Sequence, residues 1–303
     1  MSSNKRRVIA LGFFDGVHTG HGALMQAVTS AAKKLDASAC AFTFDRSPAA
    51  VITKQEIPLL SSVEDRIWLM QHYYGIQEVI VSNFNGMMRM NWEDFIVEYL
   101  VRELGVVHVV AGHDFHFGYM GQGNPDRLKA KCAEIGIGCN IIEKVEKDGI
   151  TISSTYIRNL IAQGEIARAN QFLGHPHTLT NRVSHGKRLG SSTLGFPTVN
   201  LYIPERVIVP AYGVYATRVS FNGESYSAVT NVGVRPTVKD NDGRVTVEGF
   251  ILDFNGDLYG QEIRMEFHQY LRGERKFPSF QALSEEIGRN AEQTRAYFSQ
   301  LSL

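Results

Sequence analysis

Cysteine is scarce in this chain, and the few cysteines are not arranged to bind zinc or to form a disulfide framework. Only Cys40, Cys132 and Cys139 occur in 303 residues, and no two of them have CxxC spacing. Such an odd, unpatterned set is typical of reduced cysteines in the core of an intracellular protein. We therefore expect neither a structural zinc site nor disulfide cross-links, and we expect a cytoplasmic location.

The chain also lacks long apolar runs and an excess of either charge. No uncharged apolar stretch reaches the ~18–20 residues that a membrane-spanning helix needs. The apolar stretch from Val8 to Phe14 is followed at once by Asp15, so it predicts a first strand and not a signal peptide. Lysine plus arginine number 31, as do aspartate plus glutamate, so the formal net charge is zero. Because general nucleic-acid binding depends on excess basic charge, we expect neither a membrane nor a nucleic-acid partner.

Length and patterning predict two domains. With 303 residues, of which 44% are hydrophobic, the chain can form two cores. In the first half, strands alternate with helices, which predicts a doubly wound parallel sheet of Rossmann-like type. From about residue 178, closely spaced strands and tight turns predict a small antiparallel β-barrel, followed by a C-terminal helix. We place the domains at residues 1–177 and 178–303.

Apolar periodicity and end signals predict the individual elements. The strands expected in the first domain cover residues 8–14, 39–44, 78–82, 106–111 and 138–143. The helices expected there cover residues 22–35, a segment opened by a Ser61–Glu64 capping box, 91–104, 124–135 and a stretch ending at residue 173. In the second domain we expect strands 213–221, 224–231, 245–254 and 262–270, and a helix 280–301.

The segment from Gly12 to His21 follows the first strand and opens the first helix. Free backbone N–H groups and the helix dipole favour an anion at such a point. Glycines at positions 16 and 20 let a phosphate approach the backbone. His18 and His21 are three residues apart, so they share one face of the helix and are suited to donate hydrogen bonds to a triphosphate.

This HxGH pattern resembles the motif that nucleotidyltransferases share with class I aminoacyl-tRNA synthetases, and alone it leaves that choice open. The stretch from Ile152 to Arg158 resembles the (S)STxxIR signature of nucleotidyltransferases, with Ser153, Ser154 and Thr155 at a helix N-terminus. The sequence contains no lysine loop of the KMSKS type. Together these features favour a nucleotidyltransferase.

Two further segments resemble the prokaryotic bifunctional riboflavin kinase/FAD synthetases. Residues 13–21 resemble that family's NFDGVHxGH stretch, and residues 112–124 resemble its GxDFxFGxxxxGN segment. The resemblance covers nearly the whole chain. It implies a nucleotidyltransferase domain that adenylylates FMN with ATP, giving FAD and pyrophosphate. It also implies a riboflavin-kinase-like barrel that phosphorylates riboflavin to FMN.

The resemblance also implies roles for particular residues of the first domain. Those expected to be catalytic are His18, His21 and Arg158. Those expected to bind the nucleotide are Gly12, Phe13, Asp15, Gly16, Gly20, Ser153, Ser154 and Thr155. Those expected to contact the flavin are Asp114, Phe115 and Phe117.

In the second domain, residues 195–200, 231–237 and 248–254 resemble the GFPTxN, NxGxRPT and ExHxxDF motifs of riboflavin kinases. Glu248 stands at the position of the catalytic base, and the oxygens of Thr198 and Asn200 suit Mg²⁺ bound together with ATP phosphates. The residues expected to bind nucleotide are Gly186, Lys187, Gly190 and Gly195. Those expected to contact flavin are Asn231, Arg235, Arg272, Glu274 and Phe277.

Two departures from the family pattern motivate an alternative. Ser191 and Phe250 stand where the family usually has arginine and histidine. The alternative is a monofunctional FAD synthetase whose second domain binds flavin without phosphorylating it. A sensing module without turnover and a tRNA-directed adenylate-forming enzyme are weaker alternatives. The expected small-molecule partners are riboflavin, FMN and ATP with Mg²⁺, and the oligomeric state is left open.

Overall fold

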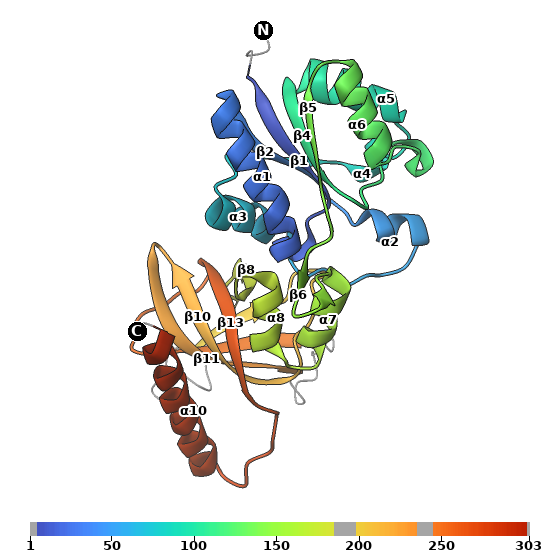
Figure 1. The fold of residues 1–303 in the computed structure, drawn as a ribbon. Helices are drawn as coiled ribbons and strands as arrows, with labels where there is room; N and C mark the ends of the chain where they lie inside the picture. The colour runs from blue at the N-terminus through green and yellow to red at the C-terminus, as the bar shows by residue number, and fades with distance from the viewer. Residues whose placement is uncertain (1–4, 185–197, 235–244, 302–303) are drawn as a thin grey trace. The chain divides into compact units, whose positions relative to one another are not determined.

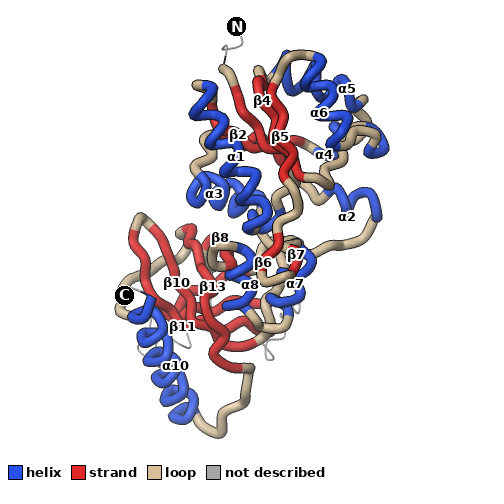
Figure 2. Tube along the Cα trace, in the orientation of Figure 1, coloured by secondary structure: helices blue, strands red, loops and turns tan. Residues whose placement is uncertain are grey.

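The computed structural model describes residues 5–184, 198–234 and 245–301 (Figures 1 and 2). By its internal contacts the chain divides into two compact units. The first comprises Met1–Ile57 and Arg66–Ser154, and the second comprises Pro58–Asp65 and Thr155–Leu303. The boundary at residues 177 and 178 stays a prediction.

A five-stranded parallel sheet forms the centre of the first unit, in the order β3-β2-β1-β4-β5. The strands are β1 (Arg7–Leu11), β2 (Ser38–Phe44), β3 (Glu78–Ser82), β4 (Val106–Gly112) and β5 (Gly138–Ile142). From β1 the chain runs outward to β2 and β3 and then returns to β4 on the other side of β1. This is the expected doubly wound sheet. The reversal leaves a crevice at the carboxyl ends of β1 and β4, where such folds bind ligands.

Helices cover both faces of this sheet (Figure 1). On one face Val8 and Ala10 of β1 pack with buried residues of α1 (Thr19–Leu35) and α3 (Val63–Tyr74). On the other face Ile9 and Leu11 pack with η2 (Phe95–Glu103) and α6 (Pro125–Glu134). Alternate residues of β1 thus enter two different cores, as a strand buried on both faces requires.

The first strand and helix differ from their predicted bounds. β1 ends at Leu11 and not at residue 14, because Phe14 has a φ of 57°, which extended strands do not adopt. The first helix begins at Thr19, three residues earlier than expected, with His18 as its N-cap. The turn from strand to helix therefore has the expected length of seven residues but lies three residues earlier, at residues 12–18.

The capping box at Ser61 and Glu64 is wrong by one position. The hydroxyl of Ser62 accepts a hydrogen bond from the backbone N–H of Asp65 at 2.9 Å. Ser62 directly precedes Val63, the first residue of α3, which is the position a capping side chain must occupy.

Other helix starts follow the sequence signals more closely. Asn124 accepts from the backbone N–H of Arg127 at 2.9 Å, and Pro125 occupies the first turn of α6, as expected. Asn91 caps α5 (Trp92–Asp94), but the helix continues into η2 with wider π-helical turns. Two short helices were not predicted, α2 (Pro48–Thr53) and α4 (Phe84–Met87).

The sheet of the first unit is followed by a short hairpin and two helices. The hairpin strands are β6 (Glu146–Lys147) and β7 (Ile150–Thr151), and the helices are α7 (Ser154–Ala162) and α8 (Ile166–Leu173). The last helix ends at residue 173, as predicted, with Gly174 in the left-handed conformation at a φ of 80°.

The second unit contains an antiparallel six-stranded sheet in the order β8-β13-β10-β11-β12-β9. Its strands are β8 (His177–Arg182), β9 (Thr198–Tyr202), β10 (Gly213–Phe221), β11 (Glu224–Val234), β12 (Val245–Ile251) and β13 (Glu262–Arg272). An isolated bridge joins Ser184, beyond β8, to Asn200 of β9, so the two edge strands meet at one point. The sheet therefore curls toward a barrel, as predicted, and α10 (Phe280–Leu301) follows it with the expected bounds.

Two turns of the barrel can be compared with the predicted hairpin and the predicted strand ends. Asn222 and Gly223, with φ of 50° and 82°, connect β10 to β11 as the hairpin signal indicated. β12 ends at Ile251, three residues before the expected end. Asp253 has a φ of 59°, so the chain leaves the sheet there.

A segment that precedes α3 belongs to the second unit. Leu59 pairs in parallel with Val207, and its N–H donates to the carbonyl of Arg206 at 2.6 Å. The backbone N–H of Thr180 donates to the carboxylate of Asp65 at 3.2 Å. A truncated chain without the barrel would leave this segment without its partners, so functional tests require the full chain.

None of the helices described combines the length and the apolarity that a bilayer span requires.

Replacing Gly118 should destabilise the first unit. Gly118 has φ 74° and ψ 177°, a conformation that is almost exclusive to glycine. A Cβ there would lie 2.7 Å from the Cα of Trp92. We expect Gly118→Ala to lower the free energy of unfolding by about 2 kcal/mol or more, as measured by urea denaturation followed by tryptophan fluorescence.

Gly136→Ala is the matched control, because Gly136 also has a φ of 74° but a Cβ there would meet nothing within 4 Å. Its substitution should cost only about 1 kcal/mol, the penalty for an L-residue with a left-handed backbone. Equal losses for the two variants would show that contact with Trp92 does not constrain Gly118.

Candidate active sites

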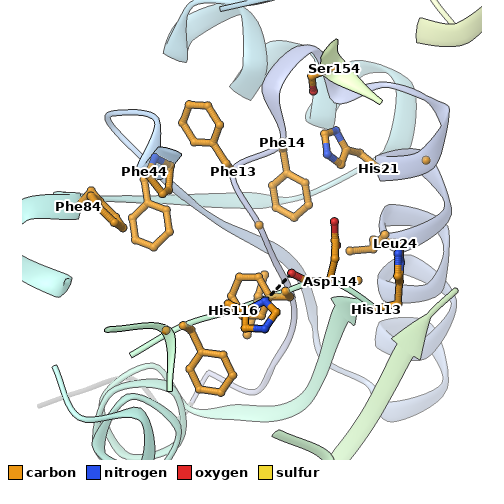
Figure 3. Close-up of a pocket in the computed structure, with 18 of the residues that line it drawn as sticks. Phe13, Phe14, His21, Leu24, Phe44, Phe84, His113, Asp114, His116 and Ser154 are labelled. Carbon is orange, nitrogen blue, oxygen red and sulfur yellow. Dashed lines mark hydrogen bonds between the residues drawn. The ribbon is translucent and has the colours of Figure 1, made fainter. Parts of the chain in front are cut away.

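A cavity of about 1000 Å³ opens at the carboxyl ends of β1 and β4 in the first unit (Figure 3). Five stretches of chain line it, one after each strand of the sheet: residues within 11–24, 44–54, 84–95, 112–121 and 142–154. The residues predicted to act on nucleotide or flavin that line this cavity are Gly12, Phe13, His18, Gly20, His21, Asp114, Phe115, Phe117, Ser153 and Ser154. The crevice expected from the strand order is thus the place where the sequence motifs meet.

The turn between β1 and α1 is built from left-handed residues. Phe14, Gly16 and Val17 have φ of 57°, 72° and 43°, and the N–H of Val17 donates to the carbonyl of Phe14 at 3.0 Å. The hydroxyl of Ser154 donates to the carbonyl of Asp15 at 3.2 Å. Asp15 and Gly16 are buried in this turn and do not line the cavity, and their predicted contact with the nucleotide stays a prediction.

His18 and His21 lie stacked at the start of α1, with ring centroids 3.6 Å apart. Nδ1 of His18 accepts a hydrogen bond from the backbone N–H of His21 at 3.3 Å, so the remaining ring nitrogen, Nε2, can donate. Phe14 meets His21 edge-on at 5.3 Å (Figure 3). Burial, reinforced by the neighbouring His18 and Arg66, lowers the pKa of His21 well below its ordinary value.

This environment keeps the His21 imidazole neutral at pH 7 until an anion arrives. A phosphate beside the ring would favour the protonated form and raise its pKa. The role of the pair in binding a polyphosphate stays a prediction.

The far wall of the cavity is apolar. The rings of Phe115 and Phe117 are stacked at 5.4 Å, and Phe117 also contacts Phe95. Further apolar lining residues are Phe44, Phe84, Met87, Met88 and Met90. Sequence reasoning had not included these methionines, although three of them within four residues is an unusual local pattern. Such a wall suits a flat aromatic group such as a flavin ring.

Arg66 is a further contributor that no motif pointed to. It is fully buried, and its Nη1 donates to the carbonyl of Phe13 at 2.6 Å and to the hydroxyl of Thr43 at 2.9 Å. Its guanidinium also lies 4.3 Å from the centre of the Phe13 ring. Arg66 thus ties the loop that follows β1 to the end of β2. Since Phe13 lines the cavity, Arg66 positions a wall of the site.

The serine-threonine segment is only partly a cavity wall. Ser153 and Ser154 line the cavity, whereas Thr155 and Arg158 are assigned to the second unit. There Nη1 of Arg158 approaches the hydroxyl of Thr155 at 3.4 Å. The phosphate-binding roles of Thr155 and Arg158 stay predictions.

A second cavity, of about 480 Å³, lies in the second unit. The predicted kinase residues that line it are Thr198, Asn231, Glu248, Arg272, Glu274 and Phe277. Of the remaining kinase predictions, Asn200 is described and buried but does not line the cavity, whereas Gly186, Lys187, Gly190, Gly195 and Arg235 lie outside the described residues.

Strand register explains how distant residues meet at this cavity. Glu248 of β12 pairs with Asn200 of β9 on one side and with Asn231 of β11 on the other. Directly paired residues place their side chains on the same face, so the carboxylate lies between two amides. Thr198 is two residues from Asn200 and shares its face. Hydroxyl, amide and carboxylate oxygens gathered in this way fit Mg²⁺, which prefers oxygen ligands and keeps several waters.

Within residues 5–184, 198–234 and 245–301, no cluster of three or more His, Cys, Asp or Glu could hold a metal. The neutral oxygens of Thr198 and Asn200 instead suit a metal that arrives with ATP phosphates. Phe250, at the histidine position of the family motif, is 8% exposed and packs with Val214, Val229 and Leu252.

Both cavities lie inside segments that match family models. A model described as FAD synthetase matches residues 1–156, and a model described as riboflavin kinase matches residues 173–298. The fold and its sites therefore define a two-part flavin-nucleotide transferase, with one part for each model.

Relatives with both parts match along almost the whole chain. The bifunctional riboflavin kinase/FMN adenylyltransferase of Listeria monocytogenes is 36% identical over 298 residues, covering 97% of this chain and 93% of that protein. The protein of the same name from Bacillus subtilis is 34% identical, covering 98% of this chain and 94% of that protein. This chain belongs to the family of bifunctional riboflavin kinase/FMN adenylyltransferases.

A solved structure shares the complete fold. A Streptococcus pneumoniae chain, titled a macrolide-efflux protein, aligns with a TM-score of 0.82 at 28% identity, covering 97% of this chain and 95% of that one. The efflux activity named in that title refers to the Streptococcus pneumoniae protein and is not assigned to this chain.

The His21 environment makes a prediction that titration by NMR can test. In the protein without ligand, the His21 ring should stay neutral well below pH 6.5, and added pyrophosphate should raise its pKa. His72, exposed on α3, should show no response to pyrophosphate and serves as the internal control. If the pKa of His21 were ordinary and did not change on adding pyrophosphate, this description of the site would be contradicted.

Proposed function

We propose that this chain makes FMN and FAD in succession. Residues 178–303 phosphorylate riboflavin with ATP and Mg²⁺, and residues 1–177 transfer AMP from a second ATP to FMN. The observation that carries this proposal is that each of the two cavities is lined by residues from its own set of motifs. The assignment is supported by the two family models and by the names of the full-length relatives.

The kinase step requires a base, because the 5′-hydroxyl of riboflavin is not ionised at neutral pH. Two carboxylates line the second cavity, Glu248 and Glu274, and Glu248 is assigned this task because it stands at the base position of the motif, between two amides. It accepts the hydroxyl proton as the new phosphorus–oxygen bond forms to the γ-phosphate and ADP leaves. Mg²⁺, held by Thr198 and Asn200, supplies positive charge to the phosphates. Asn231 borders the same carboxylate and orients the alcohol.

The adenylyl step has a different requirement. The phosphate of FMN is already anionic, so it attacks the α-phosphorus of ATP without a protein base. The bond to the β-phosphate breaks, and pyrophosphate leaves. The N-terminus of α1 and ring N–H groups of His18 and His21 stabilise the charge on the phosphates, which is the main task in such a transfer. The aromatic and methionine wall holds the flavin.

The arrangement around Glu248 favours the bifunctional enzyme over a monofunctional FAD synthetase. Phe250 replaces a family histidine, but its side chain enters an apolar cluster. The row of Asn200, Glu248 and Asn231 remains together on adjacent strands. The parts that proton transfer requires are therefore in place without the histidine.

A time course of flavin products tests the proposal. Full-length protein given riboflavin, ATP and Mg²⁺ should form FMN first and FAD afterwards, as separated by liquid chromatography. FAD formed from supplied FMN but no FMN from riboflavin would support the monofunctional alternative. If the protein formed neither FMN nor FAD, both the bifunctional and the monofunctional interpretations would be wrong.

Point variants should separate the two reactions within one chain. Glu248→Gln removes the base and should slow FMN formation by ~10²–10⁴-fold, while FAD formation from FMN stays near the wild-type rate. His21→Ala removes a phosphate donor and should slow FAD formation by ~10²–10³-fold, with FMN formation retained.

His72→Ala, on the exposed surface of α3, is the control for loss of a histidine. If Glu248→Gln left the kinase rate unchanged, Glu248 would have no part in the mechanism. Loss of both reactions in either variant would contradict the assignment of one reaction to each cavity.

A further inference from the structure

The C-terminal helix forms one wall of the kinase cavity. Phe280, Leu283, Ile287 and Asn290 of α10 all line it, at spacings of three and four residues that define one face of the helix. The family motifs that identified the site end before this helix. Those motifs therefore assign no role to the polar residues of α10.

Two arginines of the same cavity lie against one aromatic ring. Arg272 ends β13, and Arg275 follows three residues later. Their guanidinium carbons lie 5.5 and 4.8 Å from the centre of the Phe277 ring. A guanidinium and a phenyl ring are both planar groups on which a flavin ring can stack. Two cations so close repel each other, and each arginine side chain has many rotamers, so the arrangement needs a further contact to hold it.

A buried carboxylate on α10 meets both arginines. Glu286 is 7% exposed, with Oε1 placed 3.2 Å from Nε of Arg272 and Oε2 beside Nη2 of Arg275. Asn290, one turn along, accepts from Nε of Arg272 at 3.1 Å. Glu286 is not among the residues that line the cavity, so any influence on a ligand passes through the arginines.

A third arginine completes the cluster from the outside. Arg289 donates to Oε2 of Glu286 through Nε at 2.8 Å, and this contact holds the pKa of Glu286 below its ordinary value. Glu286 is therefore ionised at neutral pH. The Arg289 side chain is 59% exposed and does not line the cavity.

We infer that Glu286 is a positioning residue of the kinase site, which holds Arg272 and Arg275 against Phe277 in the arrangement that receives the flavin ring. This inference rests on the proposed kinase function. Without the carboxylate the two arginines repel each other and separate, and binding of riboflavin must then restore their order. ATP, bound through Thr198 and Asn200, does not depend on this cluster.

Glu286→Gln tests the inference because it removes the charge and keeps the shape. The KM for riboflavin should rise by ~10-fold or more, the effect expected for loss of a hydrogen bond to a charged group. The KM for ATP and the rate of FAD formation from FMN should change by less than about twofold. Glu286→Asp, which restores the charge, should recover part of the riboflavin affinity.

Arg289→Gln is the matched control, since it removes a partner of Glu286 but leaves both cavity arginines, which still pair with Glu286 and favour its charged form. It should leave both KM values unchanged. A second variant, Arg275→Gln, should weaken riboflavin binding by itself, and combining it with Glu286→Gln should add less than the two separate effects.

Three results would overturn the inference: an unchanged riboflavin KM in Glu286→Gln, equal rises in the two KM values, or the same rise in Arg289→Gln. A wild-type protein that forms no FMN would instead refute the proposed kinase function, so the two failures are distinguishable.

Discussion

Seven residues, from Gly12 to His18, reverse the direction of the chain between β1 and α1. Three of them have positive φ, among them Val17, a β-branched residue that rarely adopts this conformation. The Ser154 hydroxyl on the carbonyl of Asp15 and the buried Arg66 on the carbonyl of Phe13 support this turn from two sides. Because the turn is so short, α1 starts directly at the rim of the cavity. The two histidines and the helix terminus take their positions from it.

The two reactions place opposite demands on a protein, and the two units meet them separately. An alcohol needs a carboxylate to take its proton, and Glu248 lies between two amides on neighbouring antiparallel strands. A phosphate nucleophile needs no base but brings negative charge, and the first cavity provides neutral ring donors at a helix terminus. Histidines alone in the second site would leave the alcohol poorly activated. The chemistry explains why one chain carries two cavities of different composition.

Local signals predicted most of the architecture. The alternation of apolar strands with helices predicted the doubly wound sheet, Asn124 with Pro125 predicted the start of α6, and Asn222-Gly223 predicted the barrel hairpin. Element ends were less accurate where backbone conformation is set by tertiary contacts. The left-handed Phe14 ends β1 early, and the same holds for β12 near Asp253.

What the sequence did not predict is non-local. The pairing of Leu59 with Val207 joins residues nearly 150 positions apart, and neither segment carries a local pattern that predicts it. Arg66 and Glu286 contribute through buried contacts with the walls of the cavities, and an isolated arginine or glutamate in a helix carries no pattern. The short helix α2 was not predicted, although it does begin with a local signal, Ser47 as N-cap followed by Pro48.

The central claim is that one chain holds two nucleotide sites, one in each cavity. The most direct measurement is a crystal structure of the full-length protein with a non-hydrolysable ATP analogue and Mg²⁺. The account predicts one analogue with its phosphates at His18, His21 and the start of α1, and a second with its metal at Thr198 and Asn200. A single bound analogue at saturating concentration, or phosphates placed away from these residues, would contradict it.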